Sequence, residues 1–224
     1  GGEPFMNPEI IEILGDCLGE GLQVLVLTNA MRPMMKLAAG LAELRARYPE
    51  QLTIRVSIDH YDRQLHEEER GRRSWQPTLD GLSWLAENGF RLNVAARTRW
   101  GDSEDALRAG FTELFAQLGI DLDAADPGSL VLFPEMDETA EVPEITTACW
   151  GILDVDPADM MCASARMVVR RREAAAAEVV ACTLLPYEDE FSLGATLKES
   201  LTPVALNHPH CARFCVLGGG SCSA

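Results

Sequence analysis

The carboxy-terminal part of the chain is rich in cysteine, whose thiolate binds soft metal ions and iron–sulfur clusters. Five of the seven cysteines lie between residue 162 and the end of the chain, and they are Cys162, Cys182, Cys211, Cys215 and Cys222. Four thiolates suffice for one cubane cluster, so this grouping predicts a metal site. Zinc, with His208 or His210 as an extra ligand, and inert buried thiols are the two alternatives.

A second group of residues suited to binding follows the segments that read as strands. Its members are Gly1, Gly2 and Glu3 before the first predicted helix, Asn29 after the apolar run 22–27, and Ser57 and Asp59 after the run that starts at residue 52. Ser57 and Asp59 have the same parity on their strand, so their side chains share a face. Strand-terminating turns are the alternative interpretation for Asn29 and Ser57.

The elements that must position these residues repeat along the first part of the chain. Strand-like runs begin near residues 22, 52, 90 and 130, and helical periods fill the gaps. One helix is expected between Ser103, which can cap it, and Gly119, which can end it. This rhythm predicts an α/β fold with a parallel sheet. The runs from 52 and 90 alternate apolar and polar residues, which favours a partial (β/α) TIM-like barrel with a polar lumen over a doubly wound sheet.

The pattern changes after the last of these strands. We expect residues 1–140 to form the partial barrel and residues 141–224 to form a small cysteine-rich domain. The valine pairs at 168–169 and 179–180 flank an alanine-rich run. A β-hairpin is favoured there over a helix, which would place Cys182 just after its second strand.

Net charge, apolar runs and cysteine count restrict the partners and the location expected for this protein. The chain has 224 residues, a formal net charge of −16 and no apolar run of the roughly 18 residues that a spanning helix needs. A strongly acidic protein repels phosphate backbones and anionic lipid, so no nucleic-acid and no membrane partner is expected. An odd number of cysteines in a chain too large to need disulfides predicts a cytoplasmic location.

The order of the strand-end motifs resembles radical S-adenosylmethionine (SAM) enzymes. The motifs are Gly1-Gly2-Glu3-Pro4, Leu27-Thr28-Asn29 and Val56-Ser57-Ile58-Asp59, and the stretch from His66 to Arg70-Gly71 that follows also fits. This resemblance covers most of residues 1–133. It implies that S-adenosylmethionine is a cofactor, with Glu3 receiving its ammonium group beside the backbone of Gly1 and Gly2. Asn29, Ser57 and Asp59 would be further cofactor contacts.

The cysteine-rich end resembles the SPASM or twitch extension of the same family. This resemblance implies one auxiliary [4Fe-4S] cluster, held by Cys182, Cys211 and Cys222 with Cys162 as the fourth ligand and Cys215 as a competitor. The implied activity is that of an oxidoreductase that generates a 5′-deoxyadenosyl radical and abstracts hydrogen from a small-molecule or peptide substrate. A flavodoxin or ferredoxin would be the reductant. A non-catalytic, zinc-stabilised binding module is the alternative function.

The sequence departs from the family at one point. The three-cysteine motif C-x3-C-x2-C that holds the family's SAM-reducing cluster is absent. We expect that motif upstream of Gly1, so that the chain is N-terminally truncated and inactive alone, and no catalytic residue is assigned. Arg97 shares the predicted lumen face and would bind a carboxylate or form a salt bridge. His60 and His66 are expected to be solvated.

Overall fold

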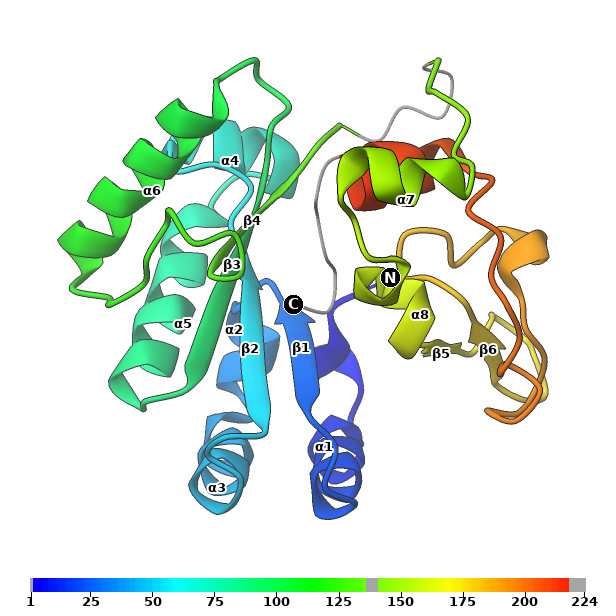
Figure 1. The fold of residues 1–224 in the computed structure, drawn as a ribbon. Coiled ribbons are helices and arrows are strands. Elements are labelled where there is room, and N and C mark those ends of the chain that lie inside the picture. The colour runs from blue at the N-terminus through cyan, green and yellow to red at the C-terminus, as the bar shows by residue number, and fades with distance from the viewer. Residues whose placement is uncertain (1, 136–140, 218–224) are drawn as a thin grey trace. The chain divides into compact units, whose positions relative to one another are not determined.

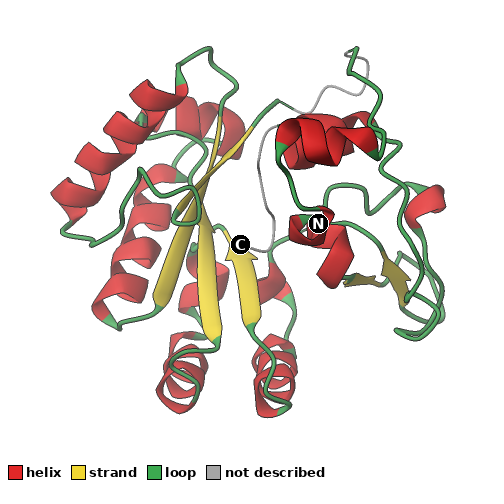
Figure 2. Ribbon diagram, in the orientation of Figure 1, coloured by secondary structure: helices red, strands yellow, loops and turns green. Residues whose placement is uncertain are grey.

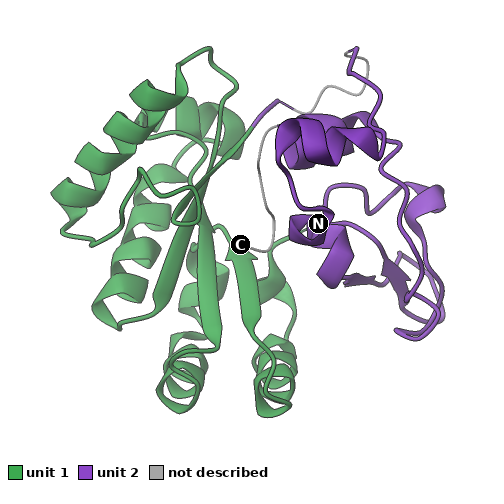
Figure 3. Ribbon diagram, viewed as in Figure 1, with its two compact units in different colours: residues 1–133 green, residues 134–224 purple. Residues whose placement is uncertain are grey.

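A computed structural model of the chain describes residues 2–135 and 141–217. The chain divides into two compact units, residues 1–133 and residues 134–224 (Figure 3). Each unit is described by itself below.

The first unit is built on a parallel four-stranded sheet (Figure 1). Its strands are β1 (Val24–Thr28), β2 (Leu52–Ser57), β3 (Arg91–Arg97) and β4 (Leu130–Phe133), in the order β1-β2-β3-β4. Its helices are η1 (Pro4–Met6), α1 (Ile10–Gly19), α2 (Arg32–Met35), α3 (Ala38–Arg47), α4 (Arg63–Arg70), α5 (Trp75–Glu87) and α6 (Glu104–Leu118). The predicted α/β fold with a parallel sheet is therefore confirmed, and the four strands are consistent with part of a barrel.

One face of this sheet forms the core with the helices. Ile54 and Val56 of β2 and Val94 of β3 are fully buried, in one apolar cluster with Leu82 of α5 and Phe111 of α6. Burying each such side chain stabilises the fold by about 1.5–3 kcal/mol. Residues at the intervening positions of β2 and β3 are polar except Ala95, so the alternation in the sequence corresponds to one apolar and one mainly polar sheet face.

The ends of α6 follow the local sequence signals. The Ser103 hydroxyl accepts a hydrogen bond of 3.2 Å from the backbone N–H of Ala106, which satisfies one of the free donors of the first turn. Gly119 ends the helix with φ of 66°, a left-handed conformation that favours glycine. Both ends of this helix were predicted correctly.

The second unit contains short elements around a hairpin (Figure 2). Strands β5 (Met167–Val169) and β6 (Glu178–Val180) pair antiparallel, where the sequence favoured a hairpin over a helix. The other elements are α7 (Ala148–Leu153), η2 (Pro157–Asp159), α8 (Met161–Ser164), η3 (Asp189–Phe191) and the π-helical turn η4 (Cys211–Val216). Across both units, none of the helices in the described ranges is long and apolar enough to cross a membrane.

Candidate functional site

The carboxylate of Glu3 is fixed at the carboxyl end of strand β1. One oxygen, Oε1, accepts hydrogen bonds from the Thr28 hydroxyl at 2.8 Å and from the backbone N–H of Phe5 at 3.2 Å. The other, Oε2, accepts from the backbone N–H of Asn29 at 2.8 Å. A carboxylate offers about four lone-pair positions, so these three donors leave it capacity for one more. Glu3 is thus an oriented anion at the edge of the sheet where its motif was expected to act.

The turn that follows β1 is held by helix α5. Asn29 accepts a backbone N–H from Met31 on its side-chain oxygen, and its carbonyl accepts the Thr78 hydroxyl at 3.1 Å. The next residue, Ala30, is fully buried with φ of 55°. Gly81 of α5 lies directly against it, since a methyl group at Gly81 would stand 1.8 Å from the Ala30 carbonyl oxygen. Thr78 and Gly81 therefore determine where Asn29 is placed.

Strand β2 ends beside β1 in register. Thr28 lies opposite Val56, so Asn29 and Ser57 follow at neighbouring positions on the same edge. Ser57 is half-buried, whereas Asp59 is 2% exposed and pairs with the Arg70 guanidinium through both of its oxygens. A buried carboxylate requires such a partner. The structure thus brings Glu3, Asn29 and Ser57 to one edge and engages Asp59 in an ion pair.

The neighbouring strand β3 contributes a second ion-pair cluster. Glu69 of α4 binds both Arg97, at the end of β3, and Arg99 in the loop beyond it. Arg97 therefore forms a salt bridge, one of the two roles that its position allowed. Together with Asp59–Arg70, this cluster attaches α4 to the carboxyl ends of β2 and β3.

The expectation that His60 and His66 are solvated is wrong. His60 is 1% exposed, accepts the Asp62 N–H on Nδ1 at 2.9 Å and lies 3.4 Å from Asp102 through Nε2. His66 is fully buried edge-on to Trp75, and neither of its ring nitrogens has a hydrogen-bond partner in the described part of the chain. Burial lowers the pKa of His66. Charged residues surround both histidines in the sequence, and this obscured the inward-facing position of their rings.

Three of the five candidate metal-binding cysteines are neighbours in the second unit. Cys162 lies in α8, Cys182 follows β6, and Cys211 begins η4. Burial raises the pKa of all three thiols, and the charge of Cys162 further raises the pKa of Cys182 and of Cys211. Such electrostatic coupling requires proximity. The role of these cysteines as metal ligands stays a prediction.

This group is not arranged as a ligand set. Within the described ranges, no three histidine, cysteine or acidic side chains have a geometry that would hold a metal ion. Cys215 lies one turn beyond Cys211 in η4. The predicted ligand Cys222 and the predicted cofactor contact Gly1 lie outside the described residues, and Gly2 is exposed.

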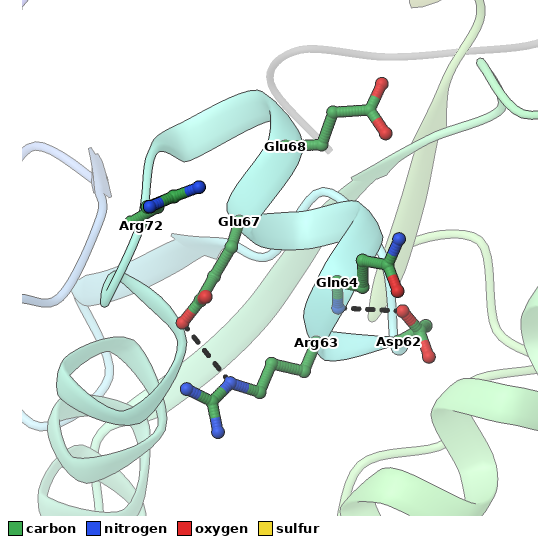
Figure 4. A pocket seen from close by; sticks show the side chains of 6 residues that line it. All are labelled: Asp62, Arg63, Gln64, Glu67, Glu68 and Arg72. Atoms are coloured by element: carbon green, nitrogen blue, oxygen red, sulfur yellow. Dashed lines mark hydrogen bonds and ion pairs between the residues drawn. The ribbon is translucent and has the colours of Figure 1, made fainter.

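A polar pocket of about 500 Å³ lies beside helix α4 in the first unit (Figure 4). It is lined by Asp62, Arg63, Gln64, Glu67, Glu68 and Arg72. Figure 4 shows Arg63 turned toward Glu67, with which it forms an exposed ion pair. The predicted cofactor contacts are not among its lining residues, so this pocket carries no argument about the SAM site.

Comparison with known proteins finds a family match in the first unit. Residues 1–98 match the family described as the radical SAM superfamily. This segment is therefore similar to radical SAM domains. The match includes Glu3, Asn29, Ser57 and Asp59, and ends one residue after Arg97. The resemblance predicted from the strand-end motifs is confirmed for this segment, whereas the SPASM-like extension is not confirmed.

Two solved structures of SuiB from Streptococcus suis are similar to this chain. The structure with bound S-adenosylmethionine is 18% identical, with a TM-score of 0.47, and covers 62% of this chain and 29% of its own. The other is 17% identical, with a TM-score of 0.48, and covers 66% of this chain and 32% of its own. The chain thus spans less than a third of the length of either structure. No curated protein matches it.

Proposed function

We propose that this chain is the body of a radical SAM enzyme. Its first unit, as a partial (β/α) barrel, binds S-adenosylmethionine at the carboxyl edge of the sheet, and its second unit holds one auxiliary [4Fe-4S] cluster. The cofactor, reduced by an iron–sulfur cluster, supplies a 5′-deoxyadenosyl radical for hydrogen abstraction from the substrate. The single observation that carries this proposal is the anchored Glu3 carboxylate within a segment that matches the family.

Glu3 is suited to receive the ammonium group of the methionyl part of SAM. Its three donors keep the carboxylate oriented without using all of its lone pairs. A charge-assisted hydrogen bond from an ammonium group to a carboxylate is stronger than a hydrogen bond between neutral groups. The Asn29 side-chain amide and the Ser57 hydroxyl lie on the same edge and would complete contacts to the cofactor. Asp59 would act on it indirectly, because its carboxylate is bound to Arg70.

The second unit offers the thiolates that an iron–sulfur cluster needs. The charges of Cys162 and Cys182 both raise the pKa of Cys211, and Cys211 is buried in an apolar cluster with Leu185 and Phe191. A fourth ligand would come from Cys215 or Cys222. Zinc is the second candidate because two imidazoles, His208 and His210, lie next to Cys211 with ring centroids 4.5 Å apart.

SAM binding tests the first half of the proposal. We expect saturation-transfer NMR, which detects weak binding, to show SAM bound to the 224-residue chain and Glu3→Gln to weaken it about tenfold or more. The compound 5′-methylthioadenosine lacks the amino acid part of SAM, so its binding should not respond to Glu3→Gln. Glu9→Gln, at an exposed position six residues later, is the matched control. Equal effects of Glu3→Gln on both compounds would contradict the proposed role.

Metal analysis tests the second half. Protein prepared without oxygen should contain iron and acid-labile sulfide, and Cys182→Ser or Cys211→Ser should remove most of both. Cys149→Ser is the matched control, because this half-buried thiol forms hydrogen bonds within its own loop, with Glu144 and Thr146. Stoichiometric zinc without sulfide would instead support the zinc-stabilised binding module.

The remaining parts of the proposal concern partners. A small-molecule or peptide substrate, a flavodoxin or ferredoxin as electron donor and a cytoplasmic location complete it. They rest on the family resemblance and on the use of cysteine in the sequence.

A further inference from the structure

The second unit contains an open apolar cavity of about 450 Å³, a volume within the roughly 300–1,000 Å³ range of ligand clefts. Val168 of β5 and Val179 of β6 stand directly opposite each other in the hairpin and both line it. Leu197 and Leu201 line it from the segment that follows β6. Val168, Leu197 and Leu201 remain 68%, 65% and 74% exposed, respectively. Three large aliphatic side chains around one hollow are a feature typical of binding surfaces.

One cation lies at this cavity. Of the described residues that line it, Arg166 alone is charged. Its guanidinium is held by neutral groups only: Nε donates to the Ser200 carbonyl at 3.1 Å, and Nη1 donates to the carbonyls of Cys162 and Ala165 at 2.6 and 2.7 Å. The remaining nitrogen, Nη2, has only a long contact of 3.4 Å to the Thr202 carbonyl.

Arg166 thus differs from several arginines of the first unit. Arg70, Arg97 and Arg108 each form an ion pair with a carboxylate. Arg166 forms none with any carboxylate in residues 2–135 and 141–217, although the chain carries a net charge of −16. Backbone carbonyls fix the guanidinium in position, but no carboxylate of the described residues neutralises its charge. An anionic group of a ligand would supply the missing ion pair.

We propose that this cavity binds the carboxy-terminal end of a peptide whose last residues are aliphatic. The terminal carboxylate would pair with Nη2 of Arg166 and accept a hydrogen bond from the Ser164 hydroxyl, which lines the same cavity. The aliphatic side chains would cover Val168, Leu197 and Leu201. Capture of a terminal carboxylate beside apolar pockets is an established mode of peptide recognition.

The openness of the cavity favours a peptide end over a free fatty acid. A small apolar ligand is usually buried over 70–90% of its surface in its site. Here, the three aliphatic walls are themselves more than 60% exposed, so they can cover one or two side chains while the peptide backbone stays in water. This inference does not depend on the proposed SAM or cluster chemistry.

Fluorescence anisotropy with the 224-residue chain tests the inference. The probe is the peptide Gly-Ser-Gly-Val-Leu with a fluorophore at its amino end, compared with the same peptide amidated at its carboxyl end. We expect amidation to weaken binding about tenfold or more, because it removes the charge that faces Arg166. Leu201→Asp should weaken binding of the acid by a similar factor. Ile152→Asp is the matched control, because it adds the same charge at a 78% exposed residue of the same unit outside the cavity.

Two further arms complete the design. Arg166→Gln should abolish the preference for the acid over the amide, and its melting curve shows whether the fold survives the loss of the carbonyl contacts. If it does not fold, the Leu201→Asp comparison decides alone. Equal binding of acid and amide, or equal weakening by Leu201→Asp and Ile152→Asp, would overturn the proposal. Tighter binding of octanoate than of the peptide would also overturn it, in favour of a free fatty acid.

Discussion

The Glu3 carboxylate accepts a hydrogen bond of 2.8 Å from the hydroxyl of Thr28, at the last position of strand β1. The same hydroxyl oxygen accepts the backbone N–H of Ala30 at 3.0 Å. Thr28 therefore joins the amino-terminal segment to the turn after β1, and it is 3% exposed. The orientation of Glu3 depends on a residue 25 positions away in the chain.

Thr28→Val should lower the free energy of unfolding by about 1–3 kcal/mol, because it leaves the buried Ala30 N–H without its acceptor and Glu3 with one donor fewer. Thr28→Ser keeps the hydroxyl and should cost about 1 kcal/mol or less. Urea unfolding monitored by fluorescence measures both. Equal losses for valine and serine would show that the methyl group, rather than the hydrogen bonds, matters at this position.

Gly81→Ala should destabilise the first unit by about 3 kcal/mol or more, because the added methyl would meet the Ala30 carbonyl at 1.8 Å and neither backbone can move freely. Gly15→Ala is the control in helix α1. Its methyl would stand 3.6 Å from Leu44, an ordinary contact, and it should stabilise the protein by about 0.5–1 kcal/mol. Thermal unfolding of the two variants should shift in opposite directions.

Arg70→Met should lower the free energy of unfolding by about 2–3 kcal/mol, because it leaves the buried Asp59 carboxylate without its cation. The cost is below that of a fully buried pair since the Arg70 side chain is itself 35% exposed. Arg63→Met removes an exposed i,i+4 partner of Glu67 from the same helix and should change stability by less than about 0.5 kcal/mol. Similar effects in a urea titration would contradict the assigned role of Asp59–Arg70.

The stability of the first unit should fall as the pH drops through about 6.5. Burial lowers the pKa of His66 from its ordinary value of 6.5, with Asp59 and Glu67 opposing and Arg70 reinforcing this effect. Between the lowered pKa and 6.5 the unfolded chain binds more protons than the folded one, so acid favours unfolding. His66→Phe should flatten the pH dependence of urea unfolding between about pH 7 and 5. An unchanged pH dependence of stability in His66→Phe would contradict the role assigned to His66.

The strands could be predicted from periodicity, because burial of alternate residues leaves a direct record in the sequence. The runs from 52 and 90 correspond to β2 and β3 within one or two residues. The ends of α6 were also predictable, since Ser103 and Gly119 act within one helical turn. Local chemistry is sufficient for such features.

Contacts between distant residues were not predictable in this way. Asp59 was predicted to face the cofactor, but its partner Arg70 is presented by a helix whose placement depends on the whole unit. His66 stands among glutamates and arginines in the sequence, yet its ring faces Trp75 in the core. For the cysteines, ligand geometry depends on irregular loops that have no periodic signal, so their role as ligands stays a prediction.

The strand order β1-β2-β3-β4 follows the chain without a jump. Each new strand therefore docks on the one made just before it, and the entropy lost in closing each intervening loop stays modest. Paired residues such as Val24 and Leu52 are nevertheless far apart in the chain, so each addition to the parallel sheet is a non-local and slow step of folding.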